Sequence, residues 1–226
     1  MAQETFAKDT SSRTMKQWAQ GIFQVFVGLT IAHLGVSMFL ISELGTDTFT
    51  IFIQGLARAT GLWTIGTWHV MILIGLMVLM FVTTKGYIKP GTVVCAFCGG
   101  WIIDLFLWIF GDRVSAASPM WLRLVVLLLG LVILSFGMSI AISSNTGVGP
   151  NDLIAIILSD KINKVHPIQF RYVRIGCDVF FVVIGFFLGG TIGIGTVIAA
   201  VLTGPIVQFF LPYTKKITAR IFPELL

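Results

Sequence analysis

The 226-residue sequence is 56% apolar and only 11% charged, with a mean hydropathy of +0.95. Soluble domains carry about 25% charged residues, so this composition excludes a water-soluble globular domain. The net charge of +5 does not indicate nucleic-acid binding, because an excess of Lys and Arg in a membrane protein reflects orientation. The apolar runs are continuous and lack the alternation of barrel strands, so we expect an all-α, polytopic helical membrane protein.

Six runs with few or no charges are long enough to span the bilayer, which takes about 20 apolar residues per helix. In chain order, the predicted spans are 18–42, 62–84, 91–110, 120–143, 167–188 and 194–213. The first run is too long for the apolar part of a cleavable signal peptide. The spans predict a cytoplasmic segment over 1–17, three spans in 18–117, three more in 118–213, and a cytoplasmic tail over 214–226.

Basic residues in the loops predict the orientation, because Lys and Arg concentrate on the cytoplasmic side. If the N-terminus lies inside, the outside loops hold only Arg58, Arg113 and Arg123. The inside segments hold Lys8, Arg13, Lys16, Lys85, Lys89, Lys161, Lys164, Lys215, Lys216 and Arg220. We therefore expect both termini in the cytoplasm.

The two halves of the chain resemble each other. Shifted by 102 residues, "GLTIAHLGVSMFLISELG" (28–45) aligns with "GLVILSFGMSIAISSNTG" (130–147). Shifted by 104 residues, "GYIKPGTVVCA" (86–96) aligns with "GTIGIGTVIAA" (190–200). Each half has three spans, an odd number, so the halves enter the membrane in opposite orientations. The sequence thus predicts six transmembrane helices in two inverted-topology repeats of three helices each.

Helix-breaking residues recur at equivalent positions of the two halves, in "GTDTFT" (45–50) and "GVGPND" (147–152). Each precedes an apolar segment too short to cross the bilayer, 49–57 and 153–158 respectively. Paired interruptions of this kind point to transporter binding sites. Each segment is predicted to be either a half-helix in a cavity or a helix lying in the membrane interface. A helix start presents unpaired N–H groups and a partial positive charge. The candidate binding residues here are Thr48, Thr50, Pro150, Asn151 and Asp152.

A family resemblance rests on two elements of the second half. "GVGPNDLIAIIL" is followed about 35 residues later by "GFFLGGTIGIGTVIAAVLTGPIVQFF". This pair resembles the YczE/YyaS/YitT group of bacterial integral membrane proteins, and the internal repeat extends the likeness to the first half. The resemblance implies a bacterial inner-membrane protein of permease-like character and adds little about mechanism.

Charged residues inside a span are costly, by a few kcal/mol at the bilayer centre, and usually functional. The fifth span carries Arg171, Arg174 and Asp178, whose spacing places them on one helical face. Arg171 is expected to extend its side chain to the cytoplasmic headgroups. Arg174 and Asp178 form either a structural ion pair or part of the wall of a polar pathway.

Four further groups are weaker candidates. His69 could contact a ligand or pack through a hydrogen bond, and Asp104 could line a cavity. His33 is expected to pack, and Asp47 to be solvated. Cys95 and Cys98 have C-x-x-C spacing, and Cys177 is a third thiol. The residues beside the C-x-x-C pair are apolar, so we expect the three cysteines to pack rather than to form a metal site.

The sequence contains no catalytic, phosphate-binding or metal-binding signature, so we expect neither an enzyme nor a cofactor. The leading hypothesis is a transporter or channel for a small anionic or zwitterionic solute, with its site between the two repeats. The alternative is a membrane-embedded scaffold or accessory subunit. The expected partners are the solute and the lipid bilayer, without nucleic acid, and a homodimer is compatible with the sequence.

Overall fold

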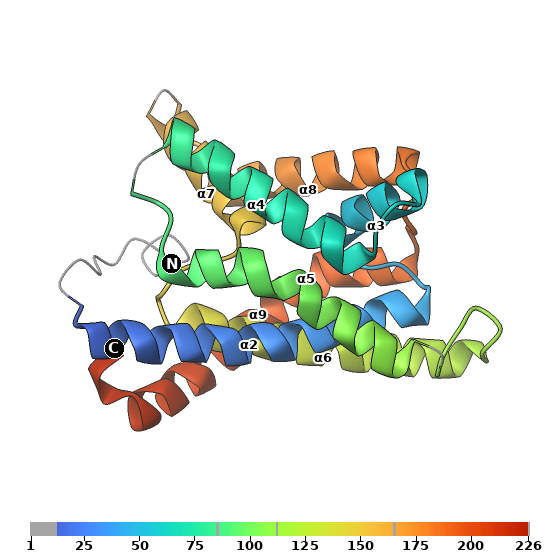
Figure 1. The fold of residues 1–226 in the computed structure, drawn as a ribbon, viewed down its shortest axis with the longest axis horizontal. Helices are drawn as coiled ribbons and strands as arrows, with labels where there is room; N and C mark the ends of the chain where they lie inside the picture. The colour runs from blue at the N-terminus through green and yellow to red at the C-terminus, as the bar shows by residue number, and fades with distance from the viewer. Residues whose placement is uncertain (1–12, 85, 112, 165, 226) are drawn as a thin grey trace.

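A computed structural model describes residues 13–225 apart from residues 85, 112 and 165, and within these residues all regular structure is helical. The sequence-based prediction of an all-α membrane protein is therefore confirmed (Figure 1). The helices are α2 (Met15–Ser42), α3 (Thr48–Thr60), α4 (Ile65–Thr83), α5 (Pro90–Phe110), α6 (Met120–Ser143), α7 (Pro150–Asn163), α8 (Phe170–Phe187), α9 (Ile194–Ile221) and the 3-10 turn η1 (Pro223–Leu225).

Among the described residues, five helices are long and apolar enough to cross a membrane, namely α2, α4, α5, α6 and α9. These correspond to five of the six predicted spans. The remaining predicted span, 167–188, forms α8, an 18-residue helix that carries Arg171, Arg174 and Asp178. These three charges lie within the predicted span, whereas the three of α9, Lys215, Lys216 and Arg220, follow the end of its span at residue 213.

Helix α9 continues without a break to Ile221, eight residues beyond residue 213, where the last predicted span ends. Two buried threonines in this extension bind the helices beside it. The Thr214 hydroxyl donates to the Ser139 carbonyl oxygen at 3.2 Å, and Gln24 Nε2 donates to Thr218 Oγ1 at 2.6 Å. The end of α9 is therefore packed against α2 and α6.

The two short segments form helices that begin 102 residues apart, at Thr48 and Pro150. Asp47 caps α3 by accepting the backbone N–H of Thr50 at 3.1 Å. Pro150 starts α7, where its missing N–H leaves no helical bond unmade. With 13 and 14 residues, α3 and α7 are about 20 Å long at 1.5 Å per residue, shorter than the hydrocarbon core.

Glycines bring α2 and α6 into close contact. A Cβ on Gly35 would lie 2.5 Å from the Gly130 carbonyl oxygen, and one on Gly28 would lie 2.8 Å from that of Gly137. Because the earlier residue of α2 faces the later residue of α6, the two helices run antiparallel, as Figure 1 shows. The close approach replaces side-chain packing with backbone contact, as is common between membrane helices.

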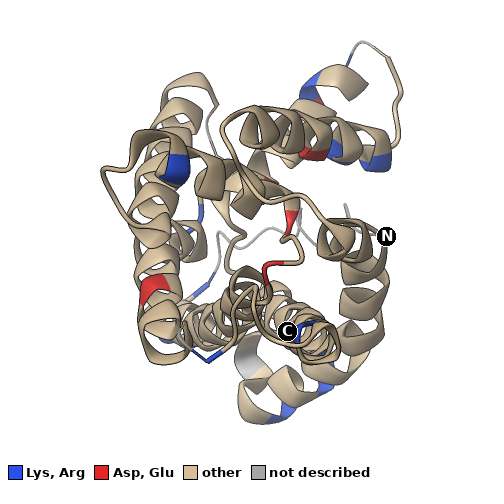
Figure 2. Ribbon diagram, turned by 90° about the vertical axis from the view of Figure 1, so that its right-hand side faces the viewer, with Lys and Arg blue, Asp and Glu red and all other residues tan. Residues whose placement is uncertain are grey.

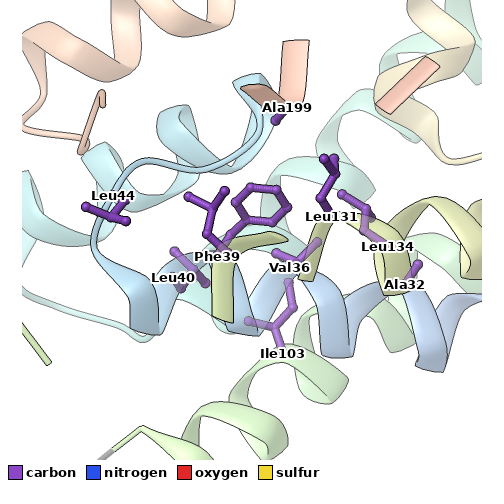
Figure 3. Packing of buried hydrophobic residues seen from close by; sticks show 10 residues of the cluster. Ala32, Val36, Phe39, Leu40, Leu44, Ile103, Leu131, Leu134 and Ala199 are labelled. Atoms are coloured by element: carbon purple, nitrogen blue, oxygen red, sulfur yellow. The ribbon is translucent and has the colours of Figure 1, made fainter. Parts of the chain in front are cut away.

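A buried cluster centred on Phe39 joins this helix pair to α5 and α9. In Figure 3, Val36, Leu131 and Leu134 lie beside the Phe39 ring, which is fully buried. Ile103 joins the cluster from α5 and Ala199 from α9. The pair α2–α6 is thus the centre against which α5 and α9 pack.

The two halves differ in how their last two helices pack. Helix α4 packs along α5, whereas the described residues of α8 make no comparable contact with α9. Gly100 on α5 is buried, and a Cβ on it would overlap the Gly66 carbonyl oxygen of α4. Its equivalent in α9, Gly204, would meet nothing within 4 Å. The α4–α5 interface is therefore closed, and the corresponding place between α8 and α9 is open.

Candidate functional site

A cavity of about 490 Å³ occupies the open place between α8 and α9. It is also lined by the middle of α2, the C-terminal half of α6, and the N-terminal ends of α3 and α7. Most of the lining is apolar, and the polar groups gather where the two short helices begin. This is the size and character of a small-molecule site.

Hydrogen bonds connect the starts of α3 and α7 through α8. The Thr48 hydroxyl donates to Asp178 Oδ1 at 2.7 Å. Arg174 Nε donates to Asp178 Oδ2 at 3.3 Å, and Arg174 Nη1 donates to Asp152 Oδ1 at 2.6 Å. We call Thr48, Asp178, Arg174 and Asp152 the polar chain. It joins one short helix of each half to a single charged helix.

Local sequence explains how these groups are held. Arg174 and Asp178 are four residues apart and therefore neighbours on α8. Asp152 lies in the first turn of α7, where the helix dipole favours a negative charge. Their side chains are 24–36% exposed, so water and ligand can reach the polar chain from the cavity. Figure 2 shows acidic positions among the helices near the middle of the molecule.

Most of the candidate residues predicted from sequence meet here. Thr50, Asn151 and His69 line the cavity together with the polar chain, and Pro150 is buried at the first position of α7. Asp104 does not join them. Its carboxylate accepts Thr64 Oγ1 at 2.5 Å and the Gly66 N–H at 2.9 Å, so it binds the start of α4.

Two histidines lie side by side at the cavity wall. The His33 and His69 rings have centroids 5.4 Å apart, and the Phe49 ring lies 5.4 Å from His69. His33 Nδ1 bonds the Leu29 carbonyl oxygen at 2.8 Å, so a neutral His33 carries its lone pair on Nε2. His69 is 7% exposed, and its Nδ1 has no hydrogen-bond partner among the described residues.

Sequence reasoning missed two lining residues. Asp47 was expected to be solvated, yet it caps α3 and lines the cavity. Its position three residues before Thr50, at the start of an apolar segment, is a cap signal that could have identified it. Cys177 also lines the cavity, whereas packing was expected. Its place one residue before Asp178 gave no clear signal.

The far ends of the short helices are tied to the opposite half. Arg58 at the end of α3 donates to the Gly189 carbonyl oxygen at 2.9 Å and to Thr191 Oγ1 at 2.8 Å. Near the end of α7, in the second half, Asp160 Oδ2 accepts a hydrogen bond of 2.9 Å from the hydroxyl of Tyr87, which belongs to the first half. Burial, and then the bond to Asp160, raise the pKa of Tyr87, which keeps this donor protonated. The far end of each short helix is thus held by a contact to the other half.

Comparison with known proteins places the chain in a family. Residues 19–212 match the model described as "Family of unknown function (DUF6198)". The uncharacterized membrane protein YczE of Bacillus subtilis (strain 168) is 30% identical over 195 residues, which cover 85% of this chain and 86% of that protein. The uncharacterized protein YyaS of the same organism is 27% identical over 190 residues, covering 84% and 92%.

A third relative extends the family beyond that genus. An uncharacterized protein of Haemophilus influenzae (strain ATCC 51907 / DSM 11121 / KW20 / Rd) is 27% identical over 183 residues, covering 81% of this chain and 79% of that protein. No solved structure matches the chain. The chain belongs to the DUF6198 family, and the resemblance to YczE and YyaS noted from its motifs is confirmed.

Proposed function

We propose that this protein is a transporter that moves a small solute across the bacterial inner membrane by alternating access, without catalysing a reaction. The observation that carries the proposal is the cavity of about 490 Å³ whose polar chain joins the starts of α3 and α7. Paired helix starts beside a cavity are the usual form of a substrate site in transporters built from inverted repeats.

Inverted repeats are supported by the helix bounds and by the central helix pair. The starts of α3 and α7 differ by 102 residues, and those of α5 and α9 by 104, the two shifts found in the sequence. The equivalent helices α2 and α6 run antiparallel. We take α8 as the sixth span, with Arg174 and Asp178 facing the cavity, and both termini as cytoplasmic.

Alternating access is supported by the unequal packing of the two halves. Leu73 of α4 and Ala96 of α5 belong to one buried cluster and are 2% and 0% exposed. At a shift of 104 their equivalents are Cys177, which is half-buried, and Ala200, which is exposed. Both line the cavity, which Leu73 borders as well. Exchanging the two arrangements would close α8 onto α9, separate α4 from α5, and expose the site to the other side of the membrane.

A scaffold or accessory subunit is the alternative function, and it needs no water-filled cavity reaching one face. The test uses the native Cys177 in a protein with Cys95→Ala and Cys98→Ala. The lining residues of α6 and α8 lie toward Ser143 and Phe170, the ends that the predicted orientation places in the cytoplasm. A membrane-impermeant methanethiosulfonate cation should therefore modify Cys177 faster in inside-out vesicles than in right-side-out ones.

As a control, Cys177 should be fully modified after the protein is denatured, which shows that the reagent is active and the thiol is free. If Cys177 stays unmodified from both sides of the folded protein, water does not enter the cavity and the transporter proposal is rejected.

A further inference from the structure

The cavity described above is better matched to a positively charged solute than to a negatively charged one. Among the described residues that line it, the carboxyl groups are those of Asp47, Asp152 and Asp178, and the cationic side chain is Arg174. Asp152 and Asp178 by themselves outnumber the guanidinium, and Asp47 adds a third carboxyl group. A solute entering this site therefore meets an excess of negative charge.

Arg174 is already engaged. Its Nη1 bonds Asp152 at 2.6 Å and its Nε bonds Asp178 at 3.3 Å. An anionic solute would have to displace one of these carboxylates and leave it unpaired in a partly buried site, which is costly. The expectation of an anionic or zwitterionic solute, drawn from the sequence, rested on the arginines and the helix N-termini. In the structure, the arginine that lines the cavity is paired with two carboxylates.

The remaining wall suits the apolar body of an organic cation. Phe49, Phe170 and Phe181 line the cavity, and aromatic faces attract cations. Leu134, Met138 and Leu211 contribute aliphatic surface. A volume of about 490 Å³ holds a drug-sized molecule rather than a bare metal ion.

His69 supplies an observation independent of the charge count. Its side chain is 7% exposed and lines the cavity, and its Nδ1 lacks a hydrogen-bond partner among the described residues. A buried ring nitrogen without a partner destabilises the empty site. This nitrogen lies in the wall beside the Phe49 ring, so the wall itself carries a polar atom for which the described residues supply no partner.

We propose that the cavity binds an organic cation, a protonated amine or quaternary onium group on an apolar or aromatic body, with the charge near Asp47, Asp152 and Asp178. This inference rests on the proposed function and names the class of its substrate. The carboxylates attract the charge, Arg174 holds two of them in place, and the apolar wall of α6 and α9 contacts the body.

The test compares two probes of the same shape and opposite charge, tetraphenylphosphonium and tetraphenylborate, by calorimetric titration into the purified protein in detergent. Tetraphenylphosphonium should bind saturably, and tetraphenylborate should not. Asp47→Asn should weaken phosphonium binding roughly tenfold, the size expected for removing one nearby charge. Asn caps helices about as well as Asp, so this variant should keep α3 folded.

Glu43→Gln is the matched control, because Glu43 is exposed, lies four residues before Asp47 and does not line the cavity. Its affinity for phosphonium should equal that of the wild type. Preferential binding of tetraphenylborate, binding of neither probe, or equal effects of Asp47→Asn and Glu43→Gln would each overturn the organic-cation proposal. The transporter proposal is judged separately, by the modification of Cys177.

Discussion

Arg174 is the residue on which the charged part of the site depends. It pairs with one carboxylate from its own helix and with another from the start of α7. Sequence spacing alone predicts the first pairing, because residues four apart on a helix are neighbours. The second pairing depends on how α7 packs against α8, which no local pattern specifies.

Replacement of Arg174 tests this arrangement. Arg174→Leu leaves Asp152 and Asp178 without their cation, and we expect it to lower the free energy of unfolding by about 1–2 kcal/mol, below the value for a fully buried pair because the groups are partly exposed. Combining it with Asp152→Asn and Asp178→Asn should restore most of that stability, as measured by thermal unfolding in detergent. A triple variant as unstable as the single one would contradict the charge-pairing account.

Sequence alone predicts the positions of some site residues correctly and not those of others. Thr48, Asp152, Arg174 and Asp178 were selected because they stand at helix breakers or inside a span, and the structure brings all four together. Asp104 was selected for the same reason and instead binds the start of α4. Asp104 and Asp178 are both charged residues in apolar runs. Only the packing of the neighbouring helices determines that Asp178 lies in the site and Asp104 does not.

At the scale of elements, hydrophobic length predicts the long helices to within a few residues, because every span must cover a hydrocarbon core of about 30 Å. The two short helices were predicted at the right places but too short, since their last turns are held by tertiary contacts such as Tyr87 to Asp160. The extension of α9 was missed because the contacts of Thr214 and Thr218 fix it.

The α2–α6 contact gives the clearest prediction at this scale. A Cβ on Gly137 would overlap the backbone of Ala32 and lie 2.6 Å from the Gly28 carbonyl oxygen. Backbone atoms cannot move aside as a flexible side chain does, so Gly137→Val should destabilise the protein by about 3 kcal/mol, the upper range for overpacking. The measurement is thermal stability of the purified variant.

Gly75→Ala on α4 is the matched control for Gly137→Val. A Cβ on Gly75 would meet nothing within 4 Å. Stability should therefore be unchanged or slightly raised, because Ala has the higher helix propensity. Equal behaviour of the two variants would show that close approach of α2 and α6 does not determine stability.

At the scale of the whole molecule, the internal repeat explains both the likeness and the difference between the halves. The pairs α2–α5 and α6–α9 pack alike, whereas α4–α5 is closed and α8–α9 is open. The sequence predicts that the two halves have equivalent helices, because identical residues recur at fixed shifts along the chain. It cannot predict which half is open, since the contacting positions are equivalent in the two halves.

The most direct test of alternating access is disulfide trapping of equivalent pairs in native membranes, with Cys95 and Cys98 replaced by Ala. One pair is Leu73→Cys with Ala96→Cys, across the closed α4–α5 interface. The other is the native Cys177 with Ala200→Cys, across the opening between α8 and α9. A disulfide requires Cα atoms within about 7 Å, so each pair reports closure of its own interface.

In a protein carrying both pairs, we expect mild oxidation to give molecules with one bridge or the other, and intact-protein mass analysis after blocking free thiols should find almost none with two. This result would mean that the two interfaces close in turn. If the bridge between Cys177 and position 200 never forms, or if both bridges form in the same molecule, the cavity does not alternate and the account of transport fails.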